Sequence, residues 1–519
     1  MSAPLGPSDP LPRTTPRRIA SNVVFTALGR AWSAVLLFVT IPILVHGIGT
    51  AAYGIFALMS VILGYVAFLD FGLTAAVVRS VAKYQSLGDL TGLSRVIGTA
   101  LTLLVALGVA GAIAIGSIAP FVIHSVLHIP AALEPDALFA FRVGALGFGC
   151  NMLLVVFAAI VQGLQRFDIF ATRTVLLSTF TSAAQIAAVL LHGGLRGVVM
   201  ATIAVSVLSF LVFLVASRRL LPSVSFRPRL DLPAARELSG FGLFRFISQA
   251  SGQLTFQFDP IIIGIFLPIS AVAFYAVPLS VTQKFHVVQD SVASAYFPAA
   301  VELHSRGDLE RLHRLYLTAL KLVFVAMAFL VVICAGYSGR LLFAWVGPEV
   351  AAHSAGIFGL LAVGYGLSAL IGLPAQASDA TGHQRWTAAF ATASAVIQVT
   401  LAFILVPRFG AIGAAAALVV NTVTQGSIFV WVVQHRFLRI SVWTVFTRAV
   451  ARPLLAALGL AAFVLVTRGR ISGAAPLVLS LAAAAMIYLA LTFLFRVWSA
   501  AELGLANQLR QSMWKRRQA

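Results

Sequence analysis

Charged residues are scarce in this chain of 519 residues, and acidic residues are the scarcest. Only 10% of positions are Asp, Glu, Lys or Arg, whereas 60% are hydrophobic and the mean hydropathy is +0.98. A soluble domain carries about 25% charged residues, so this composition excludes an ordinary soluble protein. The 36 Lys and Arg residues outnumber the 16 Asp and Glu residues. In a soluble protein this excess would suggest a nucleic-acid partner, but in so apolar a chain anionic lipid head groups account for it.

Cysteine is nearly absent, and the familiar motifs of nucleotide and metal sites are missing. The two cysteines, Cys150 and Cys334, lie far apart within apolar runs, which predicts no disulfide or metal framework. The histidines show no metal-ligand spacing and no glycine-rich segment follows a Walker pattern. We therefore expect no metal, no cofactor and no enzymatic activity. We also expect no cleavable signal, since the first 18 residues lead into an apolar run too long for a signal peptide.

Long apolar runs are what the sequence has in abundance. A helix that crosses a membrane needs about 20 apolar residues, and fourteen such runs lie between Ile19 and Val497. We predict an all-α polytopic membrane protein of about 14 transmembrane helices, in two pseudo-repeated six-helix bundles plus two C-terminal helices. The predicted order is a disordered basic N-terminal tail (1–18), an N-terminal six-helix bundle (19–217), a cytoplasmic connector (218–237), a C-terminal six-helix bundle (238–435), a connector with two additional transmembrane helices (436–497) and a basic cytoplasmic tail (498–519).

Lys and Arg are concentrated in every second connection between these runs. The N-terminal tail holds Arg13, Arg17 and Arg18, whereas the next connection, around 46–51, holds neither Lys nor Arg. The connection before the ninth run is again basic, with Lys321 counted at its end. Positive charge stays on the cytoplasmic side during insertion. The alternation therefore predicts a protein of the cell inner membrane with both termini in the cytoplasm.

Short segments of the chain recur at a nearly constant distance. Gln165-Arg166-Phe167 resembles Gln384-Arg385-Trp386, which lies 219 positions later (384 minus 165). The segment that begins at Gly194 resembles the one that begins at Gly410, 216 positions later (410 minus 194). Because six spans is an even number, both halves would start from the same side of the membrane. We predict parallel repeats with a site between the halves.

Several charged and amide side chains fall inside the predicted spans. An ionised side chain within a bilayer costs at least about 2.5–3.5 kcal/mol, so such residues are functional candidates. Arg30 lies deep in the first span, with Ser33 and Thr40 at helical spacing along the same face. Central cations exceed central acids, which favours a bound anionic substrate. The candidate substrate-binding residues are Arg30, Arg245, Lys284, Gln249 and Gln253.

Asp259 and Asp290 are the acidic residues nearest the middle of the predicted spans. Asp259 falls nearly on the helical face of Arg245, and Pro260 should kink the seventh span by removing a backbone hydrogen bond. We predict Asp259 and Asp290 as ion-coupling residues. His286 and Asp290, at positions i and i+4, are able to carry a proton or a sodium ion, or to form a hydrogen bond within the bundle.

A structural explanation of the two central arginines stays open. Arg30 and Arg245 are able to snorkel toward the membrane surface, or to form ion pairs with carboxylates such as Asp70 and Asp259.

The spans and two short motifs together resemble a known family. The turn reads Gly47-Ile48-Gly49-Thr50-Ala51-Ala52-Tyr53-Gly54 and is followed by Phe68-Leu69-Asp70-Phe71-Gly72-Leu73. Over essentially the whole chain the sequence is similar to the polysaccharide transporters of the multidrug/oligosaccharidyl-lipid/polysaccharide exporter (MOP) superfamily, the Wzx-type O-antigen and exopolysaccharide flippases. This resemblance implies a V-shaped cavity lined by spans one, two, seven and eight, with alternating access between the leaflets.

The resemblance also implies the cargo, a polyprenyl-diphosphate-linked oligosaccharide for O-antigen, exopolysaccharide or capsule biosynthesis. Arg30 and Arg245 would contact the diphosphate, since guanidinium groups bind phosphate in a bidentate manner. Expected partners are membrane lipids, a polysaccharide polymerase and chain-length proteins, and we expect no nucleic acid.

Other functions remain open at this point. A lipid II flippase of peptidoglycan synthesis would share the spans and the cationic interior. A drug/cation antiporter of the same superfamily would usually have twelve spans and an acidic site. A membrane-embedded glycosyltransferase or polysaccharide polymerase would carry large loops outside the membrane, which this sequence lacks.

Overall fold

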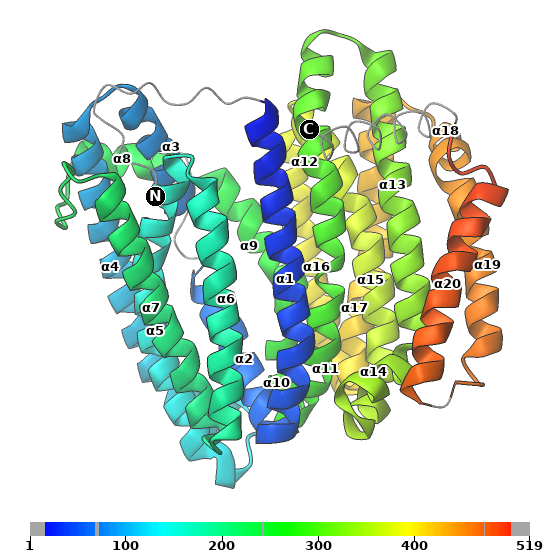
Figure 1. The fold of residues 1–519 in the computed structure, drawn as a ribbon, viewed down its shortest axis with the longest axis horizontal. Coiled ribbons are helices and arrows are strands. Elements are labelled where there is room, and N and C mark those ends of the chain that lie inside the picture. The colour runs from blue at the N-terminus through cyan, green and yellow to red at the C-terminus, as the bar shows by residue number, and fades with distance from the viewer. Residues whose placement is uncertain (1–15, 68–71, 241–242, 472, 500–519) are drawn as a thin grey trace, which may run out of the picture. The chain divides into compact units, whose positions relative to one another are not determined.

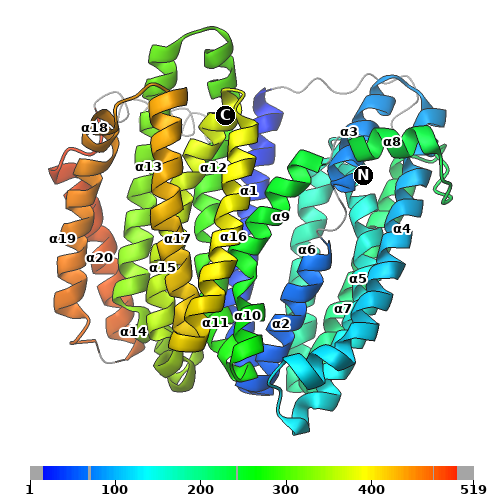
Figure 2. The same ribbon diagram turned by 180° about the vertical axis from the view of Figure 1, so that it is seen from behind.

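The computed structural model describes residues 16–67, 72–240, 243–471 and 473–499, with the backbone alone at 16–31, 65–67, 167, 239–240 and 243–249 (Figures 1 and 2). Throughout these ranges the regular structure is helical and no strand forms, apart from one isolated bridge between His128 and Pro268. The prediction of an all-α fold is therefore confirmed. Ten of the described helices are long and apolar enough to cross a membrane, and the apolar segments Trp32–Ile48 and Thr50–Gly64 are shorter. The count of fourteen spans stays a prediction.

The contacts divide the chain into two compact units. The first unit comprises residues 1–280 and 391–414, and the second comprises 281–390 and 415–519. This division does not coincide with the predicted six-helix halves, because the helices after the connector up to Ser280 group with the first unit. The two repeated bundles remain a prediction.

The first unit contains the helices of the N-terminal part of the chain. Within it α5 packs against both α4 and α7, and α1 packs along α6, as Figure 1 shows. Its helices are α1 (Pro16–Ile48), α2 (Thr50–Ala67), α3 (Leu73–Ser86), α4 (Leu90–Phe121), α5 (Glu134–Gly163), α6 (Phe167–Leu190), α7 (Gly194–Leu220), α8 (Leu232–Gly240), α9 (Leu243–Gln257), α10 (Asp259–Phe266) and α11 (Ile269–Thr282), with a π-helical turn at Val122–Val126 and a 3₁₀ turn at Ala131–Leu133.

The second unit contains most of the remaining helices. Here α13 packs against α12, α15 and α19, and α20 covers α19 (Figure 2). Its helices are α12 (Phe285–Ser305), α13 (Leu309–Gly336), α14 (Ser338–Val346), α15 (Pro348–Ala380), α17 (Ala411–Val432), α18 (Val442–Val445), α19 (Ala451–Thr467) and α20 (Ala474–Leu494), with π-helical turns at Val433–Phe437 and Phe446–Val450; residues of α16 (Gln384–Phe409) belong to both units.

The predicted seventh and eighth spans are each interrupted. The seventh is broken at Phe258, and α10 starts at Asp259 with Pro260 in its first turn, a position where proline costs no helical hydrogen bond. The chain is therefore interrupted beside Pro260, but the break lies at Phe258 and does not arise from the predicted loss of a helical hydrogen bond. The eighth is broken between Thr282 and Phe285, where Lys284 N donates to Val281 O in a tight turn. The prediction of one continuous eighth span was wrong, because the polar residues Gln283 and Lys284 form a turn between α11 and α12.

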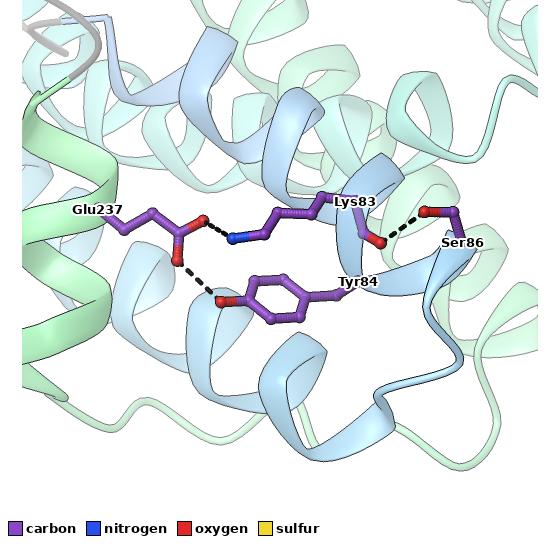
Figure 3. Close-up of polar contacts among 4 residues, drawn as sticks. All are labelled: Lys83, Tyr84, Ser86 and Glu237. Carbon is purple, nitrogen blue, oxygen red and sulfur yellow. Dashed lines mark hydrogen bonds and ion pairs between the residues drawn. The ribbon is translucent and has the colours of Figure 1, made fainter.

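The connector after α7 is attached to the rest of the first unit. Arg229 N donates to Gly98 O, and Asp231 N donates to Thr99 Oγ1. Further along, Glu237 on α8 accepts hydrogen bonds from Lys83 Nζ at 2.9 Å and from Tyr84 Oη at 2.8 Å, both on α3 (Figure 3). The connector therefore includes a short helix that side-chain contacts hold to α3, and the residues before that helix are hydrogen-bonded to α4.

Candidate functional site

Three predicted substrate-binding side chains lie outside the described residues. Arg30 belongs to α1, and Arg245 and Gln249 belong to α9, but at these positions the structure describes the backbone alone. Asp70, the proposed ion-pair partner of Arg30, also lies outside the described residues. The anion-binding hypothesis and its structural alternative therefore both stay predictions.

The remaining predicted site residues are divided between the two units. Gln253 on α9 is half-buried and Asp259 is buried, and both belong to the first unit. Lys284, half-buried at the start of α12, and Asp290, exposed on α12, belong to the second unit. Asp259 was expected nearly on the same helical face as Arg245. The break at Phe258 places the two residues on separate helices, and the shared face stays a prediction.

Asp259 is the centre of a buried polar cluster. Its side chain is 3% exposed and accepts a hydrogen bond of 2.5 Å from Tyr275 Oη on α11. Gln398 Nε2, on α16, donates to Asp259 Oδ1 at 3.1 Å. Both donors are neutral, and within the described ranges no Lys, Arg or His forms an ion pair with this carboxylate. A carboxylate inside a membrane protein with neutral partners is able to bind a cation or a proton.

A pocket of about 210 Å³ lies between α1, α2 and α6 of the first unit. Its polar lining consists of hydroxyl and amide groups, and its apolar lining includes the Phe56 ring. The lining residues are Ser33, Leu36, Leu37, Thr40, Ile41, Leu44, Tyr53, Phe56, Ser178, Ser182 and Gln185. Ser33 and Thr40, placed by the sequence on one polar face of the first span, therefore do share a polar pocket.

Three residues that line this pocket are buried, and they differ in their contacts. Gln185 is 8% exposed, and its Nε2 donates to Thr202 Oγ1 at 3.0 Å, which orients the amide. Thr40 is 5% exposed, and its Oγ1 makes no hydrogen bond to any described residue. The Tyr53 ring is buried beside the Phe56 ring, with centroids 6.4 Å apart. The pocket thus combines aromatic surface with uncharged hydrogen-bonding groups.

Two of these features were not predicted, although the sequence carries a signal for each. Gln398 stands in the middle of an otherwise apolar run, and Ser178, Ser182 and Gln185 recur at helical spacing along α6. Tyr275 gave no signal, because a tyrosine in an apolar run is indistinguishable from a packing residue.

The second unit contains a buried lysine that was counted among the loop charges. Lys321 is 8% exposed on α13, and its Nζ donates to Val497 O at 3.0 Å, just beyond the end of α20. A cation at a helix C-terminus is favourable because it meets unpaired carbonyl groups. Lys321 is therefore a buried residue of α13, which starts at Leu309, and its place on the cytoplasmic side stays a prediction.

Long apolar helices that enclose a buried carboxylate and an uncharged polar pocket define a polytopic α-helical membrane protein. The sequence profile described as "Polysaccharide biosynthesis protein" matches residues 19–304, more than half of the chain. The chain therefore belongs to the polysaccharide biosynthesis protein family.

Individual relatives agree with this assignment. The chain is 24% identical over 415 residues to the "Putative O-antigen transporter" of Shigella flexneri. This alignment covers 80% of the present chain and 97% of the Shigella protein. It is 25% identical over 324 residues to the "Uncharacterized membrane protein EpsK" of Bacillus subtilis (strain 168), covering 59% of this chain and 61% of that protein.

Solved structures share the fold. The lipid II flippase MurJ in an inward closed conformation matches 92% of this chain and 99% of its own, with a TM-score of 0.70 at 11% identity. An inward-facing multidrug resistance MATE family transporter of the MOP superfamily matches 79% of this chain and 98% of its own, with a TM-score of 0.66 at 18% identity. At these identities the likeness concerns the fold alone.

Proposed function

We propose that this protein is a flippase that moves a polyprenyl-diphosphate-linked oligosaccharide across the cytoplasmic membrane by alternating access. The observation that carries the proposal is the match to the "Putative O-antigen transporter" of Shigella flexneri over 97% of that relative's length, within a family of polysaccharide biosynthesis proteins. On this reading the protein is a transporter and not an enzyme. It resides in the inner membrane with both termini in the cytoplasm, as the alternating Lys and Arg content predicts.

The cargo sets three physical requirements. Its diphosphate is anionic, its glycan is polar and its polyprenyl tail is apolar. Arg30 and Arg245 would bind the diphosphate, with Lys284, Gln249 and Gln253 adding charge or hydrogen bonds. The tail stays in the lipid, so only the head group needs a polar path through the protein.

Asp259 is the better candidate for coupling transport to an ion gradient. It is buried between the neutral donors Tyr275 and Gln398, whereas Asp290 is exposed. A buried carboxylate with neutral partners changes its interactions strongly when a cation or proton binds. Asp290 is the second candidate for ion coupling.

After translocation, the glycan would be used by a polymerase and chain-length proteins, which are the proposed partners.

A strain that lacks this protein tests the proposal. We expect lipid-linked glycan to accumulate on the inner leaflet and surface glycan to disappear, and the wild-type chain to restore export. Arg30→Ala and Arg245→Ala should each reduce export roughly 10- to 100-fold, the loss expected when a charged hydrogen-bond donor is removed from a phosphate. Arg30→Lys and Arg245→Lys keep the charge and should retain part of the export.

A matched control uses an arginine away from the proposed path. Arg470 is exposed in the turn between α19 and α20, so Arg470→Ala should export normally. If Arg30→Ala and Arg245→Ala also export normally at equal protein levels, the anion site is wrong. If the deletion strain accumulates lipid II instead, the protein is a lipid II flippase.

A further inference from the structure

Among the residues whose side chains the structure describes, the lining of the pocket between α1, α2 and α6 carries no charged group, which separates its chemistry from that of a phosphate site. Its polar lining consists of hydroxyls (Ser33, Thr40, Tyr53, Ser178 and Ser182) and one amide, that of Gln185. Because a diphosphate needs cationic or multiple N–H partners, this pocket does not suit the charged part of a lipid-linked substrate. Its groups suit an uncharged, hydroxyl-rich ligand.

The size of the pocket and its lining also suit an uncharged, hydroxyl-rich ligand. A volume of about 210 Å³ is far larger than the roughly 10–15 Å³ that a single water molecule requires in the same measure. It is smaller than the roughly 300–1,000 Å³ of pockets that hold drug-sized ligands, so it suits one small ring. The Phe56 ring and the aliphatic side chains supply apolar surface for the C–H face of such a ring, while hydroxyl and amide groups supply hydrogen bonds for its edge.

Two lining groups are arranged as a binding site would require. Thr40 is 5% exposed and its Oγ1 is buried without a hydrogen-bond partner among the described residues, so a ligand toward which this side chain turns would supply the partner that the hydroxyl lacks. The amide of Gln185 is oriented by its bond to Thr202 and does not need to be ordered when a ligand binds.

The position of the pocket along α1 completes the argument. Ser33 follows Arg30 by three residues in the same helix, a rise of about 4.5 Å. Position 30 is where the proposed function places a contact to the diphosphate, and the first sugar of the glycan is attached directly to that diphosphate.

We propose that this pocket is a subsite for the uncharged sugar that adjoins the diphosphate of the lipid-linked oligosaccharide. This inference rests on the proposed function and adds a specificity determinant to it. Gln185 and Thr40 provide hydrogen bonds to the sugar, and the described lining offers no cation to the carboxylate of an acidic sugar.

Binding to three carrier lipids tests the subsite. The full-length protein is reconstituted in nanodiscs and titrated with polyprenyl diphosphate alone, with the same lipid bearing one neutral hexose, and with the lipid bearing one uronic acid. We expect the neutral sugar to improve the affinity about tenfold over the bare carrier, the gain from one or two neutral hydrogen bonds. The uronic acid should bring no gain.

Two variants and a matched control locate the effect. Thr40→Val and Gln185→Leu should each remove most of the gain from the neutral sugar while leaving the affinity for the bare carrier unchanged. Unchanged binding of the bare carrier also shows that these variants are folded. Thr181→Val is the control, since Thr181 precedes Ser182 on α6 but bonds to Leu177 O and does not line the pocket. It should keep the full gain.

The outcomes separate this inference from the proposed function. If the wild-type protein translocates the lipid-linked glycan but Thr40→Val and Gln185→Leu keep the gain, the subsite is wrong and the flippase proposal stands. A uronic acid that binds as well as the hexose also overturns the subsite. If the wild-type protein translocates no lipid-linked glycan, the flippase proposal is wrong, and the subsite that rests on it is wrong as well.

Discussion

Tyr275 donates a hydrogen bond of 2.5 Å to Asp259 Oδ2, and both side chains are buried. The two residues lie on α11 and α10, the helices on either side of the turn at Leu267 and Pro268. Gln398 adds a second neutral donor from a helix 139 positions further along the chain. The carboxylate is therefore solvated by the protein, yet no described residue neutralises its charge.

The first prediction concerns the charge of Asp259. Asp259→Asn keeps a side chain of the same size that still accepts a hydrogen bond from Tyr275, so the protein should fold normally. If Asp259 couples transport to a cation or proton gradient, the variant should translocate lipid-linked glycan at a rate that no longer depends on an imposed gradient. The measurement compares translocation by wild-type and variant proteoliposomes with and without a sodium or proton gradient.

A second substitution separates coupling from stability. Tyr275→Phe removes one hydrogen bond to a buried carboxylate and should lower the stability by about 1–3 kcal/mol, while transport by the folded fraction keeps its dependence on the gradient. Gradient-dependent transport by Asp259→Asn would remove Asp259 from the coupling mechanism.

The sequence predicted an all-α membrane protein correctly and indicated an interruption near Pro260. Apolar length identifies a membrane helix because lipid offers no partner to an unpaired backbone group, and proline is favoured in the first turn of a helix, where its missing N–H costs no hydrogen bond. The break before Phe285 has no proline at the interruption. This break depends on how the residues from Thr282 to Lys284 pack against the rest of the protein. The local sequence does not determine that packing.

The candidate site was predicted only in part. Asp259 was identified because an acidic residue in an apolar run is rare, but its partners Tyr275 and Gln398 come from separate helices, and their proximity depends on tertiary packing. The pocket on α1 was indicated by Ser33 and Thr40. Its opposite wall, from Ser178 to Gln185, follows from the packing of α1 along α6. A single sequence does not determine which helix faces which.

The second prediction concerns the close approach of α2 to α11 at Gly54. A Cβ atom at this position would overlap the backbone oxygen of Ile269, which cannot move away as a flexible side chain could. Gly54→Ala should therefore destabilise the protein by about 1–3 kcal/mol, the usual cost of overpacking. Thermal unfolding of the purified protein in detergent measures this loss.

Gly64 is the matched control for Gly54. It belongs to the same helix, but a Cβ atom there would meet nothing within 4 Å. Gly64→Ala should be neutral or stabilise the protein by up to about 1 kcal/mol, because alanine favours the helix over glycine. Equal unfolding temperatures for the two variants would show that α2 and α11 do not pack closely at Gly54.

The third prediction concerns the tie between α3 and α8. The hydrogen bond from Lys83 to the Glu237 carboxylate raises the pKa of the Lys83 amine above its ordinary value. Burial raises the pKa of Glu237, but hydrogen bonds from Lys83 and Tyr84 outweigh it and the net shift is downward. Lys83 thus loses its proton only at a higher pH than an isolated lysine, and the ion pair is lost as the pH rises through that raised pKa.

Amine labelling measures this shift, since only the deprotonated amine of Lys83 reacts with an acylating reagent. The pH at which Lys83 reaches half-maximal reactivity, followed by mass spectrometry, should be higher in the wild-type protein than in Glu237→Gln, which removes the anionic acceptor. Glu310→Gln provides the control, because Glu310 pairs with Arg314 on α13 and belongs to the other unit. It should leave the Lys83 profile unchanged. A Lys83 profile that is the same with and without the Glu237 carboxylate would mean that α8 is not held to α3 by this contact in the membrane protein.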